Sequence, residues 1–282
     1  MQPLIINLAV TGAVPTRHEN PNLPVTADEI SADCARCCRR GAAIVHLHAR
    51  EADGRPSCRL EVYREIVRKV RAAAPEAIVC VSTTGRHFTS FAERSQVLDL
   101  EDDLKPDMAS LTLGSMNFAT QASVNEPSMI RALADRMAER GIVPELEVFE
   151  LGMIDYAKYL IERGVLRPPL YFNLLLGSLG TLSATALNLA LLVQALPPGS
   201  SWAAAGIGRF QFPANAMAVA MDGHVRVGLE DSLYMDAAKS QPASNLALVE
   251  RIARLAEAAG REVATPDQAR AIIGLPSRVT AR

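Results

Sequence analysis

The chain has 282 residues, of which 49% are hydrophobic and 21% are charged, and its formal net charge at pH 7 is −2. This composition suits a protein with a large buried core, and it offers no general attraction for nucleic acid or for an anionic membrane surface. We therefore expect a single domain over residues 1–282 in which local groups recognise any charged ligand.

Eight short apolar runs predict β-strands, and each is followed by a segment with the apolar spacing of a helix. The predicted strands are Leu4–Val10, Ala43–Ala49, Ala77–Thr83, Met108–Leu113, Val143–Phe149, Pro169–Leu174, Ser201–Gly206 and His224–Gly228. The predicted helices are Ala27–Arg40, Arg59–Ala74, Ser90–Asp103, Asn125–Arg140, Gly152–Arg163, Ser183–Gln194, Arg209–Met221 and Ser244–Ala259.

The alternation of strands and helices predicts the fold. Runs that are apolar on both faces indicate a parallel sheet covered by helices, and eight βα units at this length predict an α/β fold of the (β/α)8 TIM-barrel type. An open doubly wound sheet is the alternative. It is disfavoured because the first strand is followed by VTGAVPTRHENPNLPVT, without the G-x-G-x-x-G of a dinucleotide-binding turn.

The same composition bears on the compartment. The N-terminal MQPLIINLAVTG has no basic region, and Asn7 interrupts its apolar run, so we interpret it as a strand rather than a signal peptide. Polar residues within Leu179–Leu196 indicate a packed helix and not a membrane span. Five cysteines, an odd number, do not predict a disulfide framework. We expect a cytoplasmic protein with no membrane segment.

Two histidines lie one residue apart at the end of the second predicted strand, in AIVHLHAR. Successive side chains of a strand point to opposite faces, so His46 and His48 point in the same direction. This is the arrangement of an H-x-H metal pair, and imidazole is a common zinc ligand. Separate structural hydrogen bonds for the two histidines are the alternative interpretation.

A catalytic zinc needs a third protein ligand, and the last strand of a closed barrel lies beside the first. Glu230 follows the eighth predicted strand and is our candidate. If strand alternation continues, Arg226 and Glu230 share a face, whereas Asp231 turns away or caps the next helix. An ordinary surface ion pair between Arg226 and Asp231 is the alternative.

Polar residues also follow the other strands, where the chemistry of a barrel gathers. Candidates for substrate binding at these ends are Thr11, Ser82, Thr83, Gly85 and Asn173. Glu145 and Glu147 alternate within an apolar strand, so one or both should face the site. Gly206, Gly208 and Arg209 in GIGRFQ occupy the usual phosphate-binding quarter of a barrel, although a plain tight turn gives the same pattern.

Several longer motifs add a resemblance. They are LAVTGAVPT, NPNLPVTADEI, GAAIVHLHAR, DGRPS, STTGR, PELEVFELG and GRFQFPANAMAVAMDGHVRVGLEDSLY. In these motifs and their order, nearly the whole chain resembles the β-keto acid cleavage enzymes, whose type member cleaves 3-keto-5-aminohexanoate. The family consists of zinc-dependent TIM barrels that transfer the CoA of acetyl-CoA while they split a β-keto acid.

The resemblance implies a set of site residues. Zn2+ is held by His46, His48 and Glu230; Arg226 and Asp231 form the dyad that starts the reaction; Ser82 with Glu145 or Glu147 lines the substrate. Two positions depart from the family pattern, since Met153 replaces a histidine and Val14 stands where the type enzyme has a carboxylate that binds the substrate's amino group. If Val14 contacts the tail of the substrate, an uncharged tail is favoured first and an amine last. An anionic tail comes second, because Arg17 and His18 lie in the same loop.

The implied activity is that of an acyltransferase, with a small-molecule β-keto acid and acetyl-CoA as its partners and homotetramers as its assembly. R–CO–CH2–COO⁻ and acetyl-CoA give R–CO–S-CoA and acetoacetate, with zinc on the keto and carboxylate oxygens and Asp231, oriented by Arg226, as the expected base. Two other functions remain open. One is a zinc hydrolase or aldolase that acts on a small keto acid without CoA, and the other is a non-catalytic barrel that binds zinc or a small acid.

Overall fold

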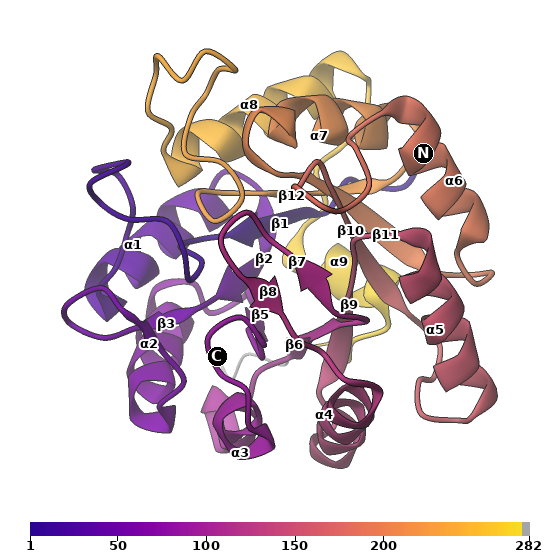
Figure 1. Ribbon diagram of the computed structural model, residues 1–282. Helices are drawn as coiled ribbons and strands as arrows, with labels where there is room; N and C mark the ends of the chain where they lie inside the picture. Colours follow the sequence, from indigo (N-terminus) through magenta and orange to yellow (C-terminus); the bar gives the residue numbers. More distant parts are fainter. Residues whose placement is uncertain (278–282) are drawn as a thin grey trace.

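Eight parallel strands close into a barrel in the computed structural model, which describes residues 1–277 (Figure 1). Around the barrel the order is β1-β12-β11-β10-β9-β6-β5-β2. The strands are β1 (Ile6–Ala9), β2 (Ala42–Leu47), β5 (Ile78–Val81), β6 (Met108–Thr112), β9 (Val143–Val148), β10 (Tyr171–Leu176), β11 (Ser201–Gly206) and β12 (His224–Val227). The predicted (β/α)8 barrel is confirmed. The expected domain also included residues 278–282, which lie outside the described residues.

Helices surround the wall of the barrel and cover one end of it (Figure 1). They are α1 (Ala27–Cys38), α2 (Leu60–Ala73), α3 (Phe91–Ser95), α4 (Pro127–Arg140), α5 (Leu151–Glu162), α6 (Ala186–Ala195), α7 (Gln211–Ala220), α8 (Asn245–Ala258) and α9 (Pro266–Ile273). The predicted helix Ser90–Asp103 is wrong in extent, because the chain forms only α3 and two 3-10 turns, η1 (Gln96–Asp99) and η2 (Asp102–Leu104), there. Extended Leu100 separates the two turns. Within the described residues, no helix has both the length and the apolar character that a bilayer crossing requires.

Three small elements were not predicted. Two are antiparallel ribbons, β3 (Ala49–Arg50) with β4 (Pro56–Ser57) and β7 (Met116–Asn117) with β8 (Ala122–Ser123). Strands of two residues are too short to give a periodic pattern. The third is α9, which lies at the N-terminal end of the barrel, where the Ser201 hydroxyl donates to the carbonyl of Ile272.

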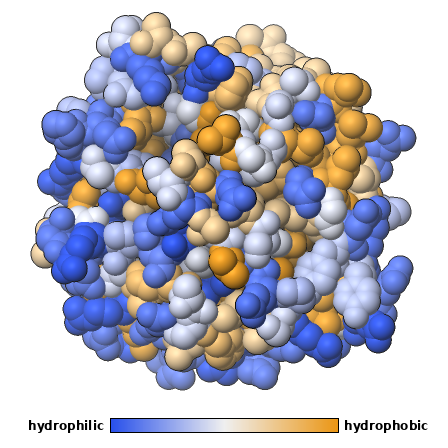
Figure 2. All heavy atoms as spheres, viewed as in Figure 1, coloured by the Kyte–Doolittle hydropathy of each residue, from blue (hydrophilic) through white to orange (hydrophobic). Residues whose placement is uncertain are grey.

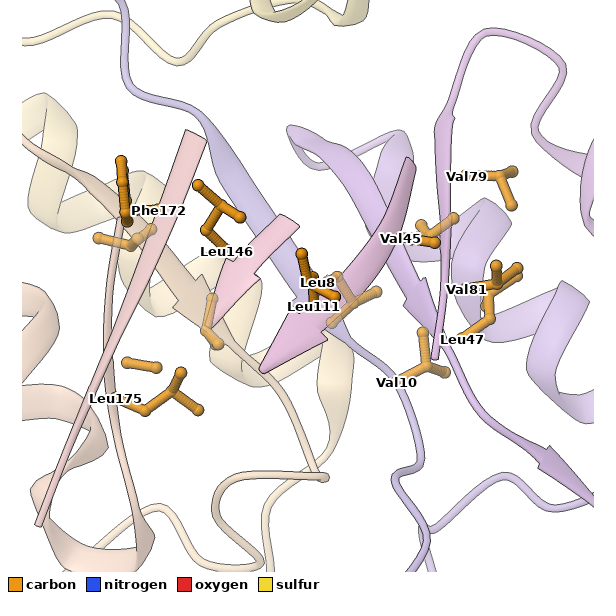
Figure 3. Packing of buried hydrophobic residues seen from close by; sticks show 14 of the residues in the cluster. Leu8, Val10, Val45, Leu47, Val79, Val81, Leu111, Leu146, Phe172 and Leu175 are labelled. Atoms are coloured by element: carbon orange, nitrogen blue, oxygen red, sulfur yellow. The ribbon is translucent and has the colours of Figure 1, made fainter. Parts of the chain in front are cut away.

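The strands are buried on both faces, which explains their nearly continuous apolar sequences. Outward-facing side chains such as Val45, Val81 and Phe172 pack against the helices (Figure 3). A second cluster, with Ile44 and Met108, fills the inside of the barrel against α9. Because this cluster fills the N-terminal end of the barrel, the site forms at the opposite end, at the carboxyl ends of the strands.

Candidate active site

A cavity of about 480 Å³ lies at the carboxyl ends of the strands. Its polar lining includes His48, Ser82, Glu147, Arg226, Glu230 and Asp231. Met116, Phe118, Phe149 and Leu175 are among its apolar residues. The volume lies within the range of sites that bind small molecules.

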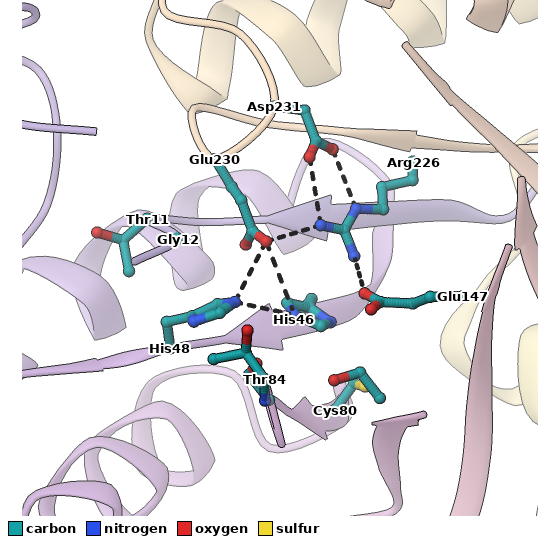
Figure 4. Close-up of polar contacts among 12 residues, drawn as sticks. Thr11, Gly12, His46, His48, Cys80, Thr84, Glu147, Arg226, Glu230 and Asp231 are labelled. Carbon is teal, nitrogen blue, oxygen red and sulfur yellow. Dashed lines mark hydrogen bonds and ion pairs between the residues drawn. The ribbon is translucent and has the colours of Figure 1, made fainter. Parts of the chain in front are cut away.

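Three metal-ligand atoms converge at the end of β2 and the turn after β12 (Figure 4). The Nε2 atoms of His46 and His48 lie 3.3 Å apart, and Glu230 Oε1 lies 3.2 Å from His48 Nε2 and 4.0 Å from His46 Nε2. Tetrahedral zinc with metal–nitrogen bonds of about 2.0 Å separates neighbouring ligand atoms by about 3.3 Å. Glu230 Oε2 is buried without a hydrogen-bond partner among residues 1–277. These three residues fit a zinc ion.

Glu145 lies inside the barrel and contacts His46. Its Oε2 is 2.6 Å from His46 Nδ1, and its Oε1 accepts a hydrogen bond of 2.6 Å from Asn7 Nδ2. Burial raises the pKa of Glu145, but the opposing effects of His46, Arg226 and Asn7 outweigh it and hold the pKa at about 2. An ionised acceptor at Nδ1 keeps the proton on that nitrogen, so the lone pair of His46 is on Nε2, as a metal ligand requires.

Arg226 is fully buried, and its guanidinium contacts four carboxylates, of which Figure 4 labels those of Glu147, Glu230 and Asp231. Its contacts are Nε to Asp231 Oδ2 at 3.0 Å, Nη2 to Glu230 Oε1 at 2.8 Å, Nη1 to Glu147 Oε1 at 3.3 Å and Nη1 to Glu145 Oε2 at 3.8 Å. Burial lowers the pKa of Arg226, but the carboxylates outweigh burial and raise it well above its ordinary value. The surface ion pair is wrong as an interpretation, because the side chains of Arg226 and Asp231 are 2% and 3% exposed.

Asp231 is a buried carboxylate. Burial raises its pKa further than the contact with Arg226 lowers it. A carboxylate with a raised pKa binds a proton from carbon more readily than an ordinary one. Burial likewise raises the pKa of Glu147, which accepts a hydrogen bond of 2.6 Å from the Thr112 hydroxyl.

A tight turn brings Glu230 and Asp231 to the same guanidinium. β12 ends at Val227, and Gly228 has a φ of 152°, where a Cβ would lie 2.0 Å from the carbonyl oxygen of Ala9. Because a side chain does not fit, glycine is required at this close approach to β1. The expected continuation of strand alternation, with Asp231 turned away or capping a helix, is therefore wrong.

The structure places the other predicted site residues in two groups. Val14, Ser82, Gly208 and Arg209 line the cavity, whereas Thr11, Thr83, Gly85, Asn173, Gly206, Glu145 and His46 do not. The Thr11 hydroxyl donates to the carbonyl of Pro24 and the Thr83 hydroxyl to that of Ser110, each at 2.6 Å. Asn173 is fully buried. Thr11 and Thr83 therefore bind the backbone behind the lining, whereas neither polar side-chain atom of Asn173 has a hydrogen-bond partner among residues 1–277.

Several lining residues were not among the candidates, and three of them show what the sequence could and could not indicate. Thr112 and Arg86 belong to polar stretches that follow predicted strands, TLGSMN and STTGR, so the sequence carried a signal for both. Phe118 comes from the β7–β8 ribbon and had no such signal.

Comparison with known proteins relates the chain to one family. A family model described as beta-keto acid cleavage enzyme matches residues 3–275. A 3-keto-5-aminohexanoate cleavage enzyme of Fusobacterium nucleatum subsp. nucleatum is 41% identical over 276 residues, which are 98% of this chain and 99% of that protein. A 3-oxoadipate:acetyl-CoA acetyltransferase of Cupriavidus necator is 38% identical over 279 residues, 98% of this chain and 96% of that protein.

A solved structure has a similar fold. The apo structure of ObcA is 25% identical, has a TM-score of 0.81 and covers 90% of this chain. The matched region spans 66% of the ObcA chain.

Proposed function

The chain belongs to the beta-keto acid cleavage enzyme family. We propose that it transfers acyl groups between a β-keto acid and acetyl-CoA. In the proposed reaction R–CO–CH2–COO⁻ and CH3–CO–S-CoA give R–CO–S-CoA and acetoacetate. One C–C bond forms between C2 of the acid and the acetyl carbonyl, CoA moves to the other carbonyl, and the original C2–C3 bond breaks in a retro-Claisen step.

One observation carries this proposal. The Arg226–Asp231 pair lies on the cavity wall with Glu230 as a shared neighbour of the two histidines. A buried carboxylate held by a cation beside a metal-ligand cluster suits removal of a proton next to a carbonyl group.

We assign zinc to His46, His48 and Glu230. Bound zinc would supply Lewis acidity that stabilises negative charge on substrate oxygens. Asp231 then accepts the C2 proton, and the contacts of 3.0 and 3.2 Å from Arg226 hold its carboxylate in place. Glu147 and Ser82, which line the same cavity, orient the acid.

We propose that acetyl-CoA enters beside η3 (Gly208–Phe210). Arg209 is exposed and lines the cavity, as does Lys239, so both cations can meet phosphate groups. The backbone N–H of Gly208 donates to the carbonyl of Asp231 at 2.7 Å and ties this segment to the base. Gly206 lies so close to the backbone of Phe210 that a Cβ would lie 2.0 Å from its carbonyl oxygen, so we assign it no contact with the cosubstrate.

A panel of β-keto acids, each incubated with and without acetyl-CoA, tests the function. The proposal predicts acetoacetate and a new acyl-CoA by mass, only when acetyl-CoA is present. Cleavage without CoA would indicate the zinc hydrolase or aldolase, and zinc binding without any product would indicate the non-catalytic barrel.

We also propose that the enzyme is a cytoplasmic homotetramer. Its five cysteines are free, which suits a reducing compartment.

Helix α6 carries no charged residue, and its Leu187 and Leu191 are 68% and 40% exposed. Hydrophobic atoms gather on the side of the molecule where α6 lies (Figure 2). An apolar helix face of this kind suits a subunit contact. Light scattering of the protein and of Leu187→Glu tests the assembly.

A further inference from the structure

Arg86 is a partly buried cation in the cavity wall. Arg86 lines the cavity, and its guanidinium forms no hydrogen bond or ion pair with any of residues 1–277. Its Nε is buried. Exposed cations such as Arg209 are hydrated and need no protein partner, whereas a buried guanidinium nitrogen without an acceptor costs free energy. A ligand that brings an acceptor would remove this cost.

Arg86 is also held in one place. Its backbone N–H donates to Thr84 Oγ1 at 3.2 Å, and its carbonyl accepts from Gln121 Nε2 at 3.1 Å. The guanidinium carbon lies 3.9 Å from the centroid of the Phe118 ring. The preceding Gly85 is packed so closely that a Cβ would lie 2.7 Å from the carbonyl oxygen of Val124. A side chain fixed in this way loses little conformational entropy when it binds a ligand.

The neighbouring charges leave Arg86 available. Of the five carboxylates in the cavity wall, those of Glu147, Glu230 and Asp231 contact Arg226. The other two, Glu19 and Asp236, accept hydrogen bonds within their own loops. Burial lowers the pKa of Arg86, and Glu230 opposes this from a distance. Arginine nevertheless remains charged in proteins, and its planar guanidinium can donate hydrogen bonds to both oxygens of a carboxylate.

We propose that Arg86 binds a second carboxylate, at the far end of the substrate, and that the enzyme therefore acts on β-keto dicarboxylates. This inference rests on the proposed function and names its substrate class. Val14, Met116 and Phe149 line the same cavity and offer apolar contacts for the methylene groups between the two charges. The order expected from Val14, Arg17 and His18 placed uncharged tails first, and it changes to anionic tails first because Arg86 lines the cavity.

The test compares 3-oxoadipate with 3-oxohexanoate, which have the same number of carbons and differ in the terminal carboxylate. The ratio of their kcat/KM values should favour 3-oxoadipate by at least about 10-fold, and Arg86→Met should lower that ratio roughly 10²-fold, the scale for truncating one partner of a buried charge pair. Arg86→Lys should restore part of it. Arg163→Met is the matched control, because Arg163 also lies over an aromatic ring, Tyr159 at 5.1 Å, but outside the cavity.

Calorimetry without acetyl-CoA measures the same contact without turnover. Arg86→Met should weaken the binding of 3-oxoadipate and leave a smaller difference between the two acids. An equal loss for both acids, or a rise only in the KM for acetyl-CoA, would overturn the inference and assign Arg86 to the CoA phosphates. Turnover of 3-oxohexanoate with no preference for 3-oxoadipate would refute the substrate class alone, whereas absence of acetyl-CoA-dependent products from every acid in the panel would refute the proposed function.

Discussion

Replacement of Asp231 by asparagine tests the proposed base with little change of shape. The variant keeps the volume of the side chain but loses the charge that accepts the C2 proton. Arg226 retains its contacts with Glu230 at 2.8 Å and Glu147 at 3.3 Å, so the guanidinium is not left unpaired. We expect a stability loss of only about 1–2 kcal/mol, the scale of one charged hydrogen bond, and a fall in kcat of roughly 10² to 10⁴-fold, the contribution of a positioned base.

The assay has two parts. Initial rates of acyl-CoA formation give kcat, and deuterium exchange at C2 of the β-keto acid, corrected for the spontaneous rate, isolates the proton transfer. Asp53→Asn is the control, because Asp53 pairs with Arg55 on the surface and its side chain is 52% exposed. If Asp231→Asn exchanges C2 deuterium and forms product at wild-type rates, Asp231 is not the base and the reasoning from its burial fails.

Three further predictions concern the metal site and stability. Glu145→Gln should lower zinc affinity about 10 to 100-fold, the usual effect of losing a carboxylate behind a histidine ligand, and competition with a chelator measures it. His46→Ala and Glu230→Ala should each lose the single zinc per chain and the activity while circular dichroism remains unchanged; full activity in metal-free protein would contradict the ligand assignment. Burial lowers the pKa of His224 from 6.5 to about 4, and its Nδ1 accepts a hydrogen bond from the backbone N–H of Ile5. The folded state favours the neutral ring, so its stabilising effect is present above pH 6.5 and is lost as the pH falls toward 4. Between pH 7 and pH 5 the protein should lose about 2 kcal/mol more stability than His224→Asn, which keeps an acceptor but does not titrate, and denaturant unfolding at the two pH values checks this.

The barrel could be predicted because its strands are buried on both faces, whereas its helices are buried on one face only. That difference gives two clear periodicities, continuous apolar runs and helical spacing, in regular alternation. The failures lie where these patterns are short or interrupted. The predicted helix Ser90–Asp103 contains apolar residues at helical spacing, but extended Leu100 ends the 3-10 turn that follows α3. The β7–β8 ribbon has two residues in each strand.

Some residues of the candidate site could likewise be predicted from the sequence, and others could not. His46, His48 and Glu230 were chosen from the period of a strand and from barrel closure, and the structure brings their ligand atoms together. The turn at Gly228 was not foreseen, because a glycine at the end of a strand pattern is also compatible with a straight strand. Whether a polar residue at a strand end lines the cavity depends on its rotation about the strand, and Thr83 shows that a neighbour of a lining residue can point into the scaffold instead.

Incubation of an accepted β-keto acid with acetyl-CoA labelled with ¹³C in both acetyl carbons tests the central claim most directly. The proposed reaction places both labels in C3 and C4 of acetoacetate and leaves the new acyl-CoA unlabelled, because the acetyl group becomes the methyl ketone half of the product. Carbon NMR and mass spectrometry locate the label. Unlabelled products in the presence of labelled acetyl-CoA, or label in the acyl group of the new thioester, would contradict the account.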